Sequence, residues 1–145
     1  LLVGCMFGVM KRNSRTAWAL LVGMSLAACE QVPGEGGRAS IVGHVQEEAR
    51  TVLTQPSSAP PYPATDHNVF LIYGDNVGPD DNVETNHNGD FVFPWLRPGE
   101  YTVYVYSEDT SGTVPPRDMA VVRTVTIESQ TETVVLDTLT VYKDL

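Results

Sequence analysis

The 145-residue sequence predicts an all-β fold that begins after an apolar N-terminal segment. From Ala39 onward, apolar residues occupy every second position of several short segments, as they do in strands that bury one face. Residues that favour turns, mainly Gly, Pro, Asn and Asp, separate these segments. No long segment keeps the 3.6-residue period of an amphipathic helix. These observations together predict a β-sandwich of about seven strands.

The N-terminal segment has the layout of a secretory signal. It starts with three basic residues, Lys11, Arg12 and Arg15, and continues with residues 17–28, which are mostly apolar or small. This apolar run is shorter than the ~20 residues that a transmembrane helix needs. We therefore expect a cleaved signal, with translation starting at Leu1 or at Met10.

The signal ends with Leu26-Ala27-Ala28-Cys29, which resembles the lipobox of bacterial lipoproteins. The resemblance implies cleavage before Cys29 and lipidation of its sulfur. Several acyl chains hold a protein stably at a membrane, since each buried CH₂ contributes ~0.8 kcal/mol. The expected location is extracytoplasmic, anchored to a bacterial membrane through Cys29, with the periplasmic or surface side of an outer membrane favoured. An ordinary secreted protein is the alternative.

Cleavage at this point divides the chain into a signal (1–28), a tether (29–38) and a domain (39–145). The tether contains Pro33 and three glycines, a composition typical of flexible coil. The signal takes basic residues and no acidic residue with it, so the mature chain is more acidic than the net charge of −9 of the whole sequence. Such a surface repels nucleic acid and anionic lipid headgroups, and both are poor partners.

The strands of the domain are expected in order at residues 41–45, 69–73, 83–86, 91–93, 101–106, 121–127 and 133–141. In 41–45, Ile41 and Val45 share one face. In 101–106, the odd-numbered residues are expected to point inward, and Tyr104 and Tyr106 outward. Residues 47–54 are compatible with a brief helix or an edge strand.

Two turns have clear local chemistry. Asn88-Gly89 is the strongest short-range signal for a β-hairpin, because both residues tolerate the positive φ of a type I′ turn. Pro98-Gly99 places proline and glycine at the two corners that a type II turn prefers. We expect a hairpin at the first turn and a type II turn at the second.

The residues around these turns resemble a known signature. Residues 85–93 (TNHNGDFVF) and 96–103 (LRPGEYTV) are similar to the pattern T-D-x-x-G-x-F-x-F … L-x-P-G-x-Y-x-V of carboxypeptidase regulatory-like and Cna B-type domains. The resemblance implies a seven-stranded Greek-key β-sandwich of the transthyretin-like kind. It also implies a non-catalytic accessory, adhesive or structural module at a bacterial surface. Some Cna B-type domains carry an isopeptide bond that needs an early lysine. We expect none here, because Lys143 is the only lysine after the signal.

The sequence offers little for catalysis. His44, His67 and His87 are far apart and show no spacing typical of a metal site or a catalytic triad. No Gly-x-Ser-x-Gly elbow is present, and Cys29 is the only cysteine after the signal. We therefore expect no enzyme activity.

An acidic stretch raises the question of calcium, which takes six to eight oxygen ligands. The candidate ligands are Asp80, Asp81, Glu84, Asn86, Asn88 and Asp90. Trp95 stands where an EF-type loop needs a bidentate glutamate, and Asn and Asp also favour turns for backbone reasons. We expect a solvated turn and no cofactor, with Ca²⁺ binding as the alternative.

Aromatic side chains are the remaining candidates for ligand binding. Exposed Tyr104, Tyr106 and Trp95 could stack on sugars or contact a protein. Alternatively, Trp95 and several tyrosines could fill the core of the sandwich or cover its end. Exposure of the two tyrosines beside another aromatic ring would favour a ligand platform. The sequence thus predicts a non-catalytic, lipid-anchored envelope protein with a structural or protein-interaction domain. The alternative is a carbohydrate- or ligand-binding module, so the expected partner is an envelope protein or a glycan.

Overall fold

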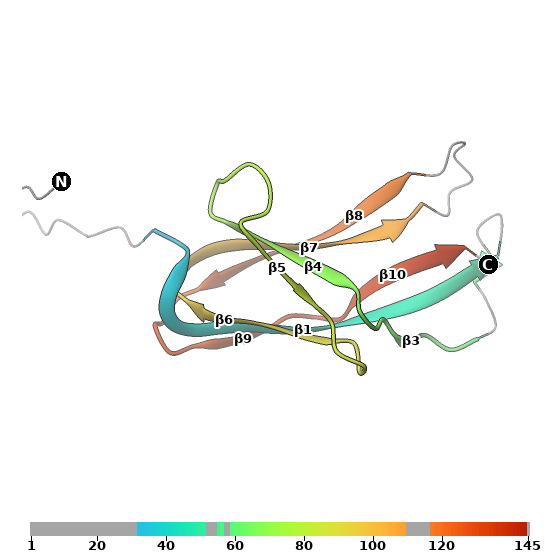
Figure 1. Ribbon diagram of the computed structural model, residues 1–145, viewed down its shortest axis with the longest axis horizontal. Helices are drawn as coiled ribbons and strands as arrows, with labels where there is room; N and C mark the ends of the chain where they lie inside the picture. The colour runs from blue at the N-terminus through green and yellow to red at the C-terminus, as the bar shows by residue number, and fades with distance from the viewer. Residues whose placement is uncertain (1–31, 52–54, 57–58, 110–116, 145) are drawn as a thin grey trace, which may run out of the picture.

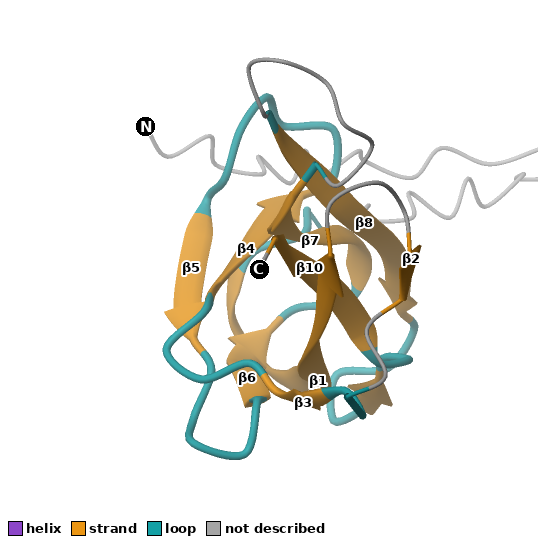
Figure 2. Cartoon of the chain, turned by 90° about the vertical axis from the view of Figure 1, so that its right-hand side faces the viewer, coloured by secondary structure: helices purple, strands orange, loops and turns teal. Residues whose placement is uncertain are grey.

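The computed structural model describes residues 32–51, 55–56, 59–109 and 117–144. These residues form ten strand segments in two sheets and contain no helix. The two sheets lie over each other as a sandwich (Figures 1 and 2). Within the described ranges, no helix is long and apolar enough to cross a membrane. The predicted all-β, sandwich-like fold is confirmed.

The first sheet is built around one long strand, β1 (Glu35–Thr51). Its partners are β2 (Gln55–Pro56), β3 (Tyr62–Pro63), β6 (Asp90–Leu96), β9 (Thr133–Val135) and β10 (Leu139–Asp144). The strands β2, β3 and β6 run antiparallel to β1, while β9 and β10 run parallel to it. Residues 47–51 therefore continue β1 and have strand partners on both sides, so they form neither the helix nor the edge strand that the sequence left open. Residues 52–54 lie outside the described residues.

The second sheet is antiparallel throughout and has the order β5-β4-β7-β8. Its strands are β4 (Asn68–Tyr73), β5 (Asp81–Glu84), β7 (Gly99–Glu108) and β8 (Asp118–Ile127). The two sheets meet at β7 and β10, where the Ser107 hydroxyl accepts a hydrogen bond of 2.7 Å from the Tyr142 backbone N–H. Ser107 is buried at this contact.

The core lies between the sheets and follows the two-residue period of the sequence. Tyr101, Val103 and Val105 of β7 are fully buried, whereas Tyr104 is half-buried and Tyr106 is exposed. The inward side of β1 contributes Ile41 and Val45 in the same way. The other buried apolar residues of this cluster are Ala39, Ala64, Val69, Leu71, Phe91, Phe93, Leu96, Ile127, Leu139 and Val141.

Residues 133–141 form two strands, not the single strand expected. β9 ends at Val135 and β10 begins at Leu139, and both pair with β1. Between them the Leu136 N–H still donates to the Val42 carbonyl at 2.8 Å. The chain thus stays beside β1 while the ladder is interrupted at 136–138.

The N-terminal boundary of the domain also differs from the expected one. β1 begins at Glu35 and Gly34 is buried, so residues 34–38 belong to the domain and not to a flexible tether. The glycines that suggested a flexible tether instead allow close packing. Gly37 lies directly against β6, and a Cβ at this position would collide with the backbone of Leu96 and Arg97. The predicted signal 1–28, Cys29 and the first tether residues lie outside the described residues.

Both predicted turns connect the two sheets. β5 pairs with β4 and β6 pairs with β1, so the Asn88-Gly89 turn does not close a hairpin. Gly89 has a φ of 81°, but Asn88 is not among the residues with positive φ, so the turn is not type I′. The Asn86 side chain holds it instead by accepting hydrogen bonds from the N–H groups of Asn88 and Asp90. Gly99 has a φ of 150°, larger than the +80° of a type II turn.

Candidate functional site

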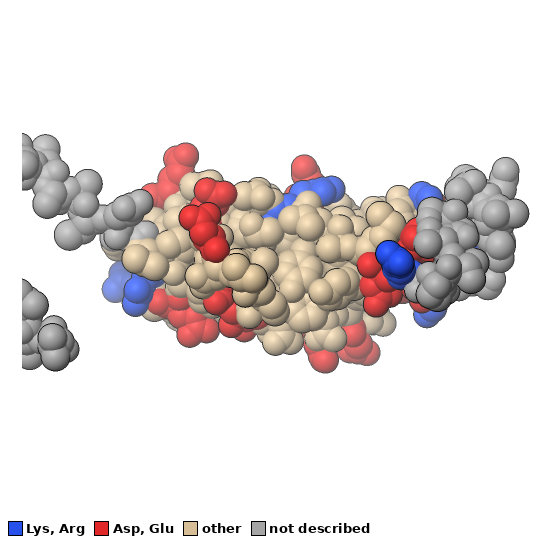
Figure 3. Space-filling model, turned by 90° about the horizontal axis from the view of Figure 1, so that it is seen from above, with Lys and Arg blue, Asp and Glu red and all other residues tan. Residues whose placement is uncertain are grey.

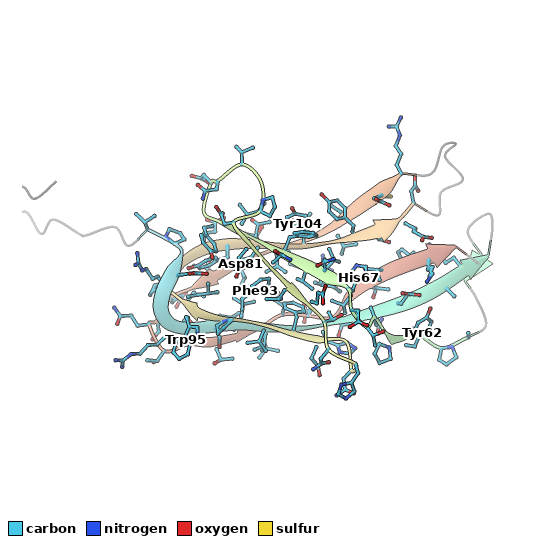
Figure 4. All side chains as sticks on the ribbon, viewed as in Figure 1. Tyr62, His67, Asp81, Phe93, Trp95 and Tyr104 are labelled. Atoms are coloured by element: carbon cyan, nitrogen blue, oxygen red, sulfur yellow. The ribbon has the colours of Figure 1, made fainter. Side chains whose placement is uncertain are left out.

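Three aromatic rings form a cluster on the outer side of the β5-β4-β7-β8 sheet. Phe70 of β4 lies opposite Tyr104 of β7 in the register, and their rings stack with centroids 5.1 Å apart. Tyr106 meets both rings edge-on, with centroids 5.6 Å from each. Figure 4 shows Tyr104 on the side of β7 that faces away from the other sheet. We call Phe70, Tyr104 and Tyr106 the aromatic face.

The aromatic face is accessible, and its direct cross-strand neighbours are uncharged. Tyr106 is 46% exposed, while Phe70 and Tyr104 are half-buried. Across the strands, Asn82 stands opposite Phe70 and Val122 stands opposite Tyr104. The adjacent outward row consists of Ile72, Thr102 and Thr124. Much of the centre of this side of the molecule is free of charged side chains (Figure 3).

Tyr104 is a neutral hydrogen-bonding group of this cluster. Burial, and then the neighbouring Tyr106, raise the pKa of Tyr104 above its ordinary value of 10. Its hydroxyl therefore keeps its proton at neutral pH and can both donate and accept a hydrogen bond. The arrangement offers apolar ring surface together with hydroxyl and amide groups, which suits binding.

Trp95 is exposed because β6 contains one extra residue at this point. Leu96 pairs with Ala39 and Phe93 with Ile41, so three steps on β6 match two on β1, which is a β-bulge. Trp95 takes a φ of 60° and its side chain is 67% exposed. A left-handed conformation costs a non-glycine residue about 1–2 kcal/mol. The expectation that Trp95 fills the core is therefore wrong.

Trp95 does not join the aromatic face. It belongs to the β1 sheet, whereas Tyr104 and Tyr106 belong to the other sheet, and Figure 4 shows it well apart from Tyr104. Two of the three predicted aromatic candidates thus come together, and the third stands alone.

A shallow basic pocket of about 610 Å³ lies beside the bulge. Its lining consists of Val32, Gly36, Gly37, Arg38, Arg97, Pro98 and Gln130. The Arg97 guanidinium packs on Gly36, where an added Cβ would lie 3.0 Å from one of its nitrogens. This pocket brings together two cationic side chains on an otherwise acidic chain.

The six predicted calcium ligands do not form one cluster. Asp80 and Asp81 stand at the start of β5, and Glu84 and the Asn86–Asp90 turn stand at or after its end. The Asp80 carboxylate already accepts hydrogen bonds from the Tyr73 N–H (2.7 Å) and the Asn76 amide (2.9 Å). Within the described part of the chain, no three His, Cys, Asp or Glu side chains are placed to hold a metal ion.

The three histidines have different partners, and His44 lies against the turn that contains His87. His44 Nδ1 lies 3.0 Å from the Asp90 carboxylate, where β1 pairs with β6. His67 Nε2 lies 2.9 Å from the Tyr106 carbonyl oxygen, and His87 is exposed in the Asn86–Asp90 turn. His44 and His67 thus each hold a neighbouring strand or segment.

Sequence reasoning missed two parts of these surfaces. Phe70 could have been found from its position between the inward residues Val69 and Leu71, which makes it outward-facing. Its contact with Tyr104 depends on the register of β4 and β7 and has no local signal. The pocket at Arg38 and Arg97 depends on how residues 34–38 bend against β6, and no motif marks it.

No protein-family profile matches this chain, and no curated protein matches it. A similar solved structure is that of a Pseudomonas aeruginosa protein named as a candidate carbohydrate-binding protein. It is 15% identical in sequence, the alignment covers 72% of this chain and 90% of that chain, and the TM-score is 0.46.

Proposed function

We propose that this chain is a non-catalytic, lipid-anchored binding module of the bacterial cell envelope that holds an uncharged carbohydrate on the aromatic face. The observation that carries the proposal is the contact of Phe70, Tyr104 and Tyr106 on the outer side of a sheet. Three aromatic rings packed side by side outside the core do not serve the packing between the two sheets. They offer a ready surface for a ligand.

Carbohydrate fits the chemistry of this surface. The C–H faces of sugar rings are apolar and stack on aromatic rings, while their hydroxyls need hydrogen-bonding partners. The Tyr106 hydroxyl and the side chains of Asn82 and Thr124 lie on exposed residues of the same side of the sheet. A neutral sugar also avoids the repulsion that an acidic ligand would meet from this acidic chain.

We further propose a transthyretin-like Greek-key topology of the carboxypeptidase regulatory-like kind. Support comes from the residues of the sequence signature, because its apolar positions are buried. They are Phe91, Phe93, Leu96, Tyr101 and Val103. Seven of the strands run for four residues or more, which matches the number in that fold.

The edge of β8 favours a protein partner as a second candidate function. This ten-residue strand pairs with β7 on one side only, within the described residues. Met119 and Val122 on it are about half exposed. An apolar edge with unpaired backbone groups can add a strand from another protein.

Binding to a glycan array tests the first candidate. We expect the purified protein to bind neutral glycans, and Tyr106→Ala to weaken binding at least about fivefold, since stacking and a hydrogen bond together contribute ~1–3 kcal/mol. Tyr62→Ala is the matched control, because Tyr62 is 44% exposed and lies on the other sheet. Absence of glycan binding, or equal loss in both variants, contradicts the carbohydrate proposal.

The second candidate and the anchor need their own tests. Thr126→Pro removes an N–H from the free edge of β8, since the Asp109 N–H pairs with the Arg117 carbonyl and the odd-numbered residues of β8 therefore face β7. If a protein pairs at this edge, co-purification of that protein from solubilised envelope is lost. A Cys29→Ala variant that still floats with membranes would show that the lipid anchor is wrong.

A further inference from the structure

The N-terminal segment enters the domain at one end of the sandwich. Val32 is the first described residue, and only Glu30 and Gln31 separate it from Cys29. Three extended residues span at most about 10 Å. Figure 1 shows the segment entering where β1 bends, at the end far from the C-terminus. If Cys29 is lipidated, this end must therefore lie close to the membrane surface.

Two exposed apolar side chains occur at this end. Trp95 is 67% exposed on the β6 bulge, and Val32 is 70% exposed. Figure 4 shows Trp95 at the same end as the entering segment. Tryptophan is enriched at membrane interfaces, because its apolar ring and its N–H suit the headgroup level. The left-handed backbone of Trp95 keeps the ring in solvent at the very place where a membrane would be.

Two arginines lie at the same end of the sandwich as Val32 and Trp95. Arg38 and Arg97 line the pocket that also contains Val32, and neither takes part in an ion pair within the described residues. Figure 3 shows basic side chains at this end of the molecule, with acidic side chains nearby. The nearby Glu132 carboxylate is turned toward its own loop, where it accepts hydrogen bonds from the N–H groups of Glu128 and Ser129. A guanidinium group binds phosphate through paired hydrogen bonds.

We propose that Val32, Arg38, Trp95 and Arg97, which we call the anchor end, rest against the phospholipid headgroups, with the Trp95 ring at headgroup depth and the arginines paired with lipid phosphates. This inference rests on the proposed lipidation of Cys29. The long axis of the sandwich then stands away from the membrane (Figure 1), and the aromatic face at Tyr104 stays open to the side (Figure 4). The general acidity of the chain opposes membrane binding, so the contact forms only once the lipid holds the domain there.

Fluorescence provides a direct test, because the chain has two tryptophans and Trp18 lies in the cleaved signal. Trp95 is then the only tryptophan of the mature protein. The lipidated protein is reconstituted into vesicles of phosphatidylethanolamine and phosphatidylglycerol that carry a nitroxide either at the headgroup or at the end of an acyl chain. We expect strong quenching by the headgroup nitroxide, weak quenching by the deep one, and a blue-shifted emission.

The matched control carries Trp95→Phe together with Tyr106→Trp, which moves the single tryptophan to the aromatic face. We expect its emission to be unaffected by either nitroxide. Arg38→Gln with Arg97→Gln is expected to reduce quenching of Trp95 while flotation with vesicles is retained. If the wild-type protein floats but Trp95 is not quenched, the anchor end is wrong and the lipid anchor stands. If the protein does not float with the vesicles, the lipid anchor and the anchor end are both wrong.

Discussion

The buried hydroxyl of Tyr101 accepts a hydrogen bond of 2.9 Å from the backbone N–H of Gly34, which lies 67 positions earlier in the chain. The same hydroxyl donates to the Arg97 carbonyl at 2.7 Å, and the Arg97 N–H donates to the Gly34 carbonyl at 2.8 Å. One side chain of the core thus fixes the N-terminal segment to the turn between β6 and β7. This contact is the reason why the domain begins before Glu35.

Replacing this tyrosine therefore loosens the N-terminal segment. We expect Tyr101→Phe to lower the free energy of unfolding by about 1–3 kcal/mol, because the buried N–H of Gly34 loses its partner. Urea denaturation measures the change, and limited proteolysis should show faster cleavage near residue 34. The control is Tyr106→Phe, whose exposed hydroxyl should change stability by no more than about 0.5 kcal/mol. Equal stability of the two variants would contradict this account.

Gly43 leaves room for a core ring. It stands opposite Phe91 in the β1–β6 register, and a Cβ at this position would overlap the Phe91 ring. Since Phe91 is buried and cannot move aside, we expect Gly43→Ala to destabilise the protein by about 1–3 kcal/mol. Gly78→Ala stands in open space, so its cost of about 1–2 kcal/mol comes from the positive φ alone, and we expect Gly43→Ala to be the more destabilising of the two. Thermal denaturation of both variants shows which of them lowers the melting temperature more.

The backbone strain at Trp95 can be measured with two substitutions that both remove the ring. Asparagine tolerates a left-handed conformation, whereas a β-branched residue does not. We expect Trp95→Asn to raise the free energy of unfolding by about 0.5–1 kcal/mol, because asparagine relieves part of a backbone strain of ~1–2 kcal/mol. Trp95→Val should lower the free energy of unfolding, because valine increases this strain. Identical unfolding midpoints for the two variants would mean that the bulge carries no strain.

Alkaline pH should weaken the fold through Tyr73. Burial, followed by the charges of Asp81, Glu35 and Asp80, raises the pKa of Tyr73 to about 12, against 10 in the unfolded chain. The unfolded state loses this proton first, so stability is fully present below about pH 10 and falls as pH rises toward 12. Urea midpoints measured across this range should fall more steeply for the wild type than for Tyr73→Phe. If the urea midpoints of the two proteins fall equally with pH, Tyr73 is not the group that weakens the fold.

Calcium should have little effect on stability. The Asp80 carboxylate and the Asn86 side-chain oxygen already accept hydrogen bonds from neighbouring N–H groups, so binding a cation would disrupt both turns. We expect the melting temperature to be the same in millimolar CaCl₂ and in EDTA. Asp80→Ala should destabilise the loop by about 1 kcal/mol in either buffer, because it removes these hydrogen bonds. A rise in melting temperature in CaCl₂ would instead support calcium binding at the acidic stretch.

Local pattern determined which side chains of a strand face the core. In β7, the alternation alone placed Tyr101, Val103 and Val105 inward and Tyr104 and Tyr106 outward, since successive side chains of a strand point to opposite faces. The same period located most of the other strands. These properties depend on residues that are close in sequence, so they can be inferred without knowing the fold.

Only the tertiary structure decided which strands are neighbours. The Asn88-Gly89 and Pro98-Gly99 turns look local, yet each leads from one sheet to the other, because β6 finds its partner in β1 and not in β5 or β7. The register of β4 with β7 brings Phe70 to Tyr104, and one extra residue in β6 sends Trp95 outward. Strand pairing joins residues far apart in the chain, and a single-residue shift reverses every side chain, so local sequence does not specify it.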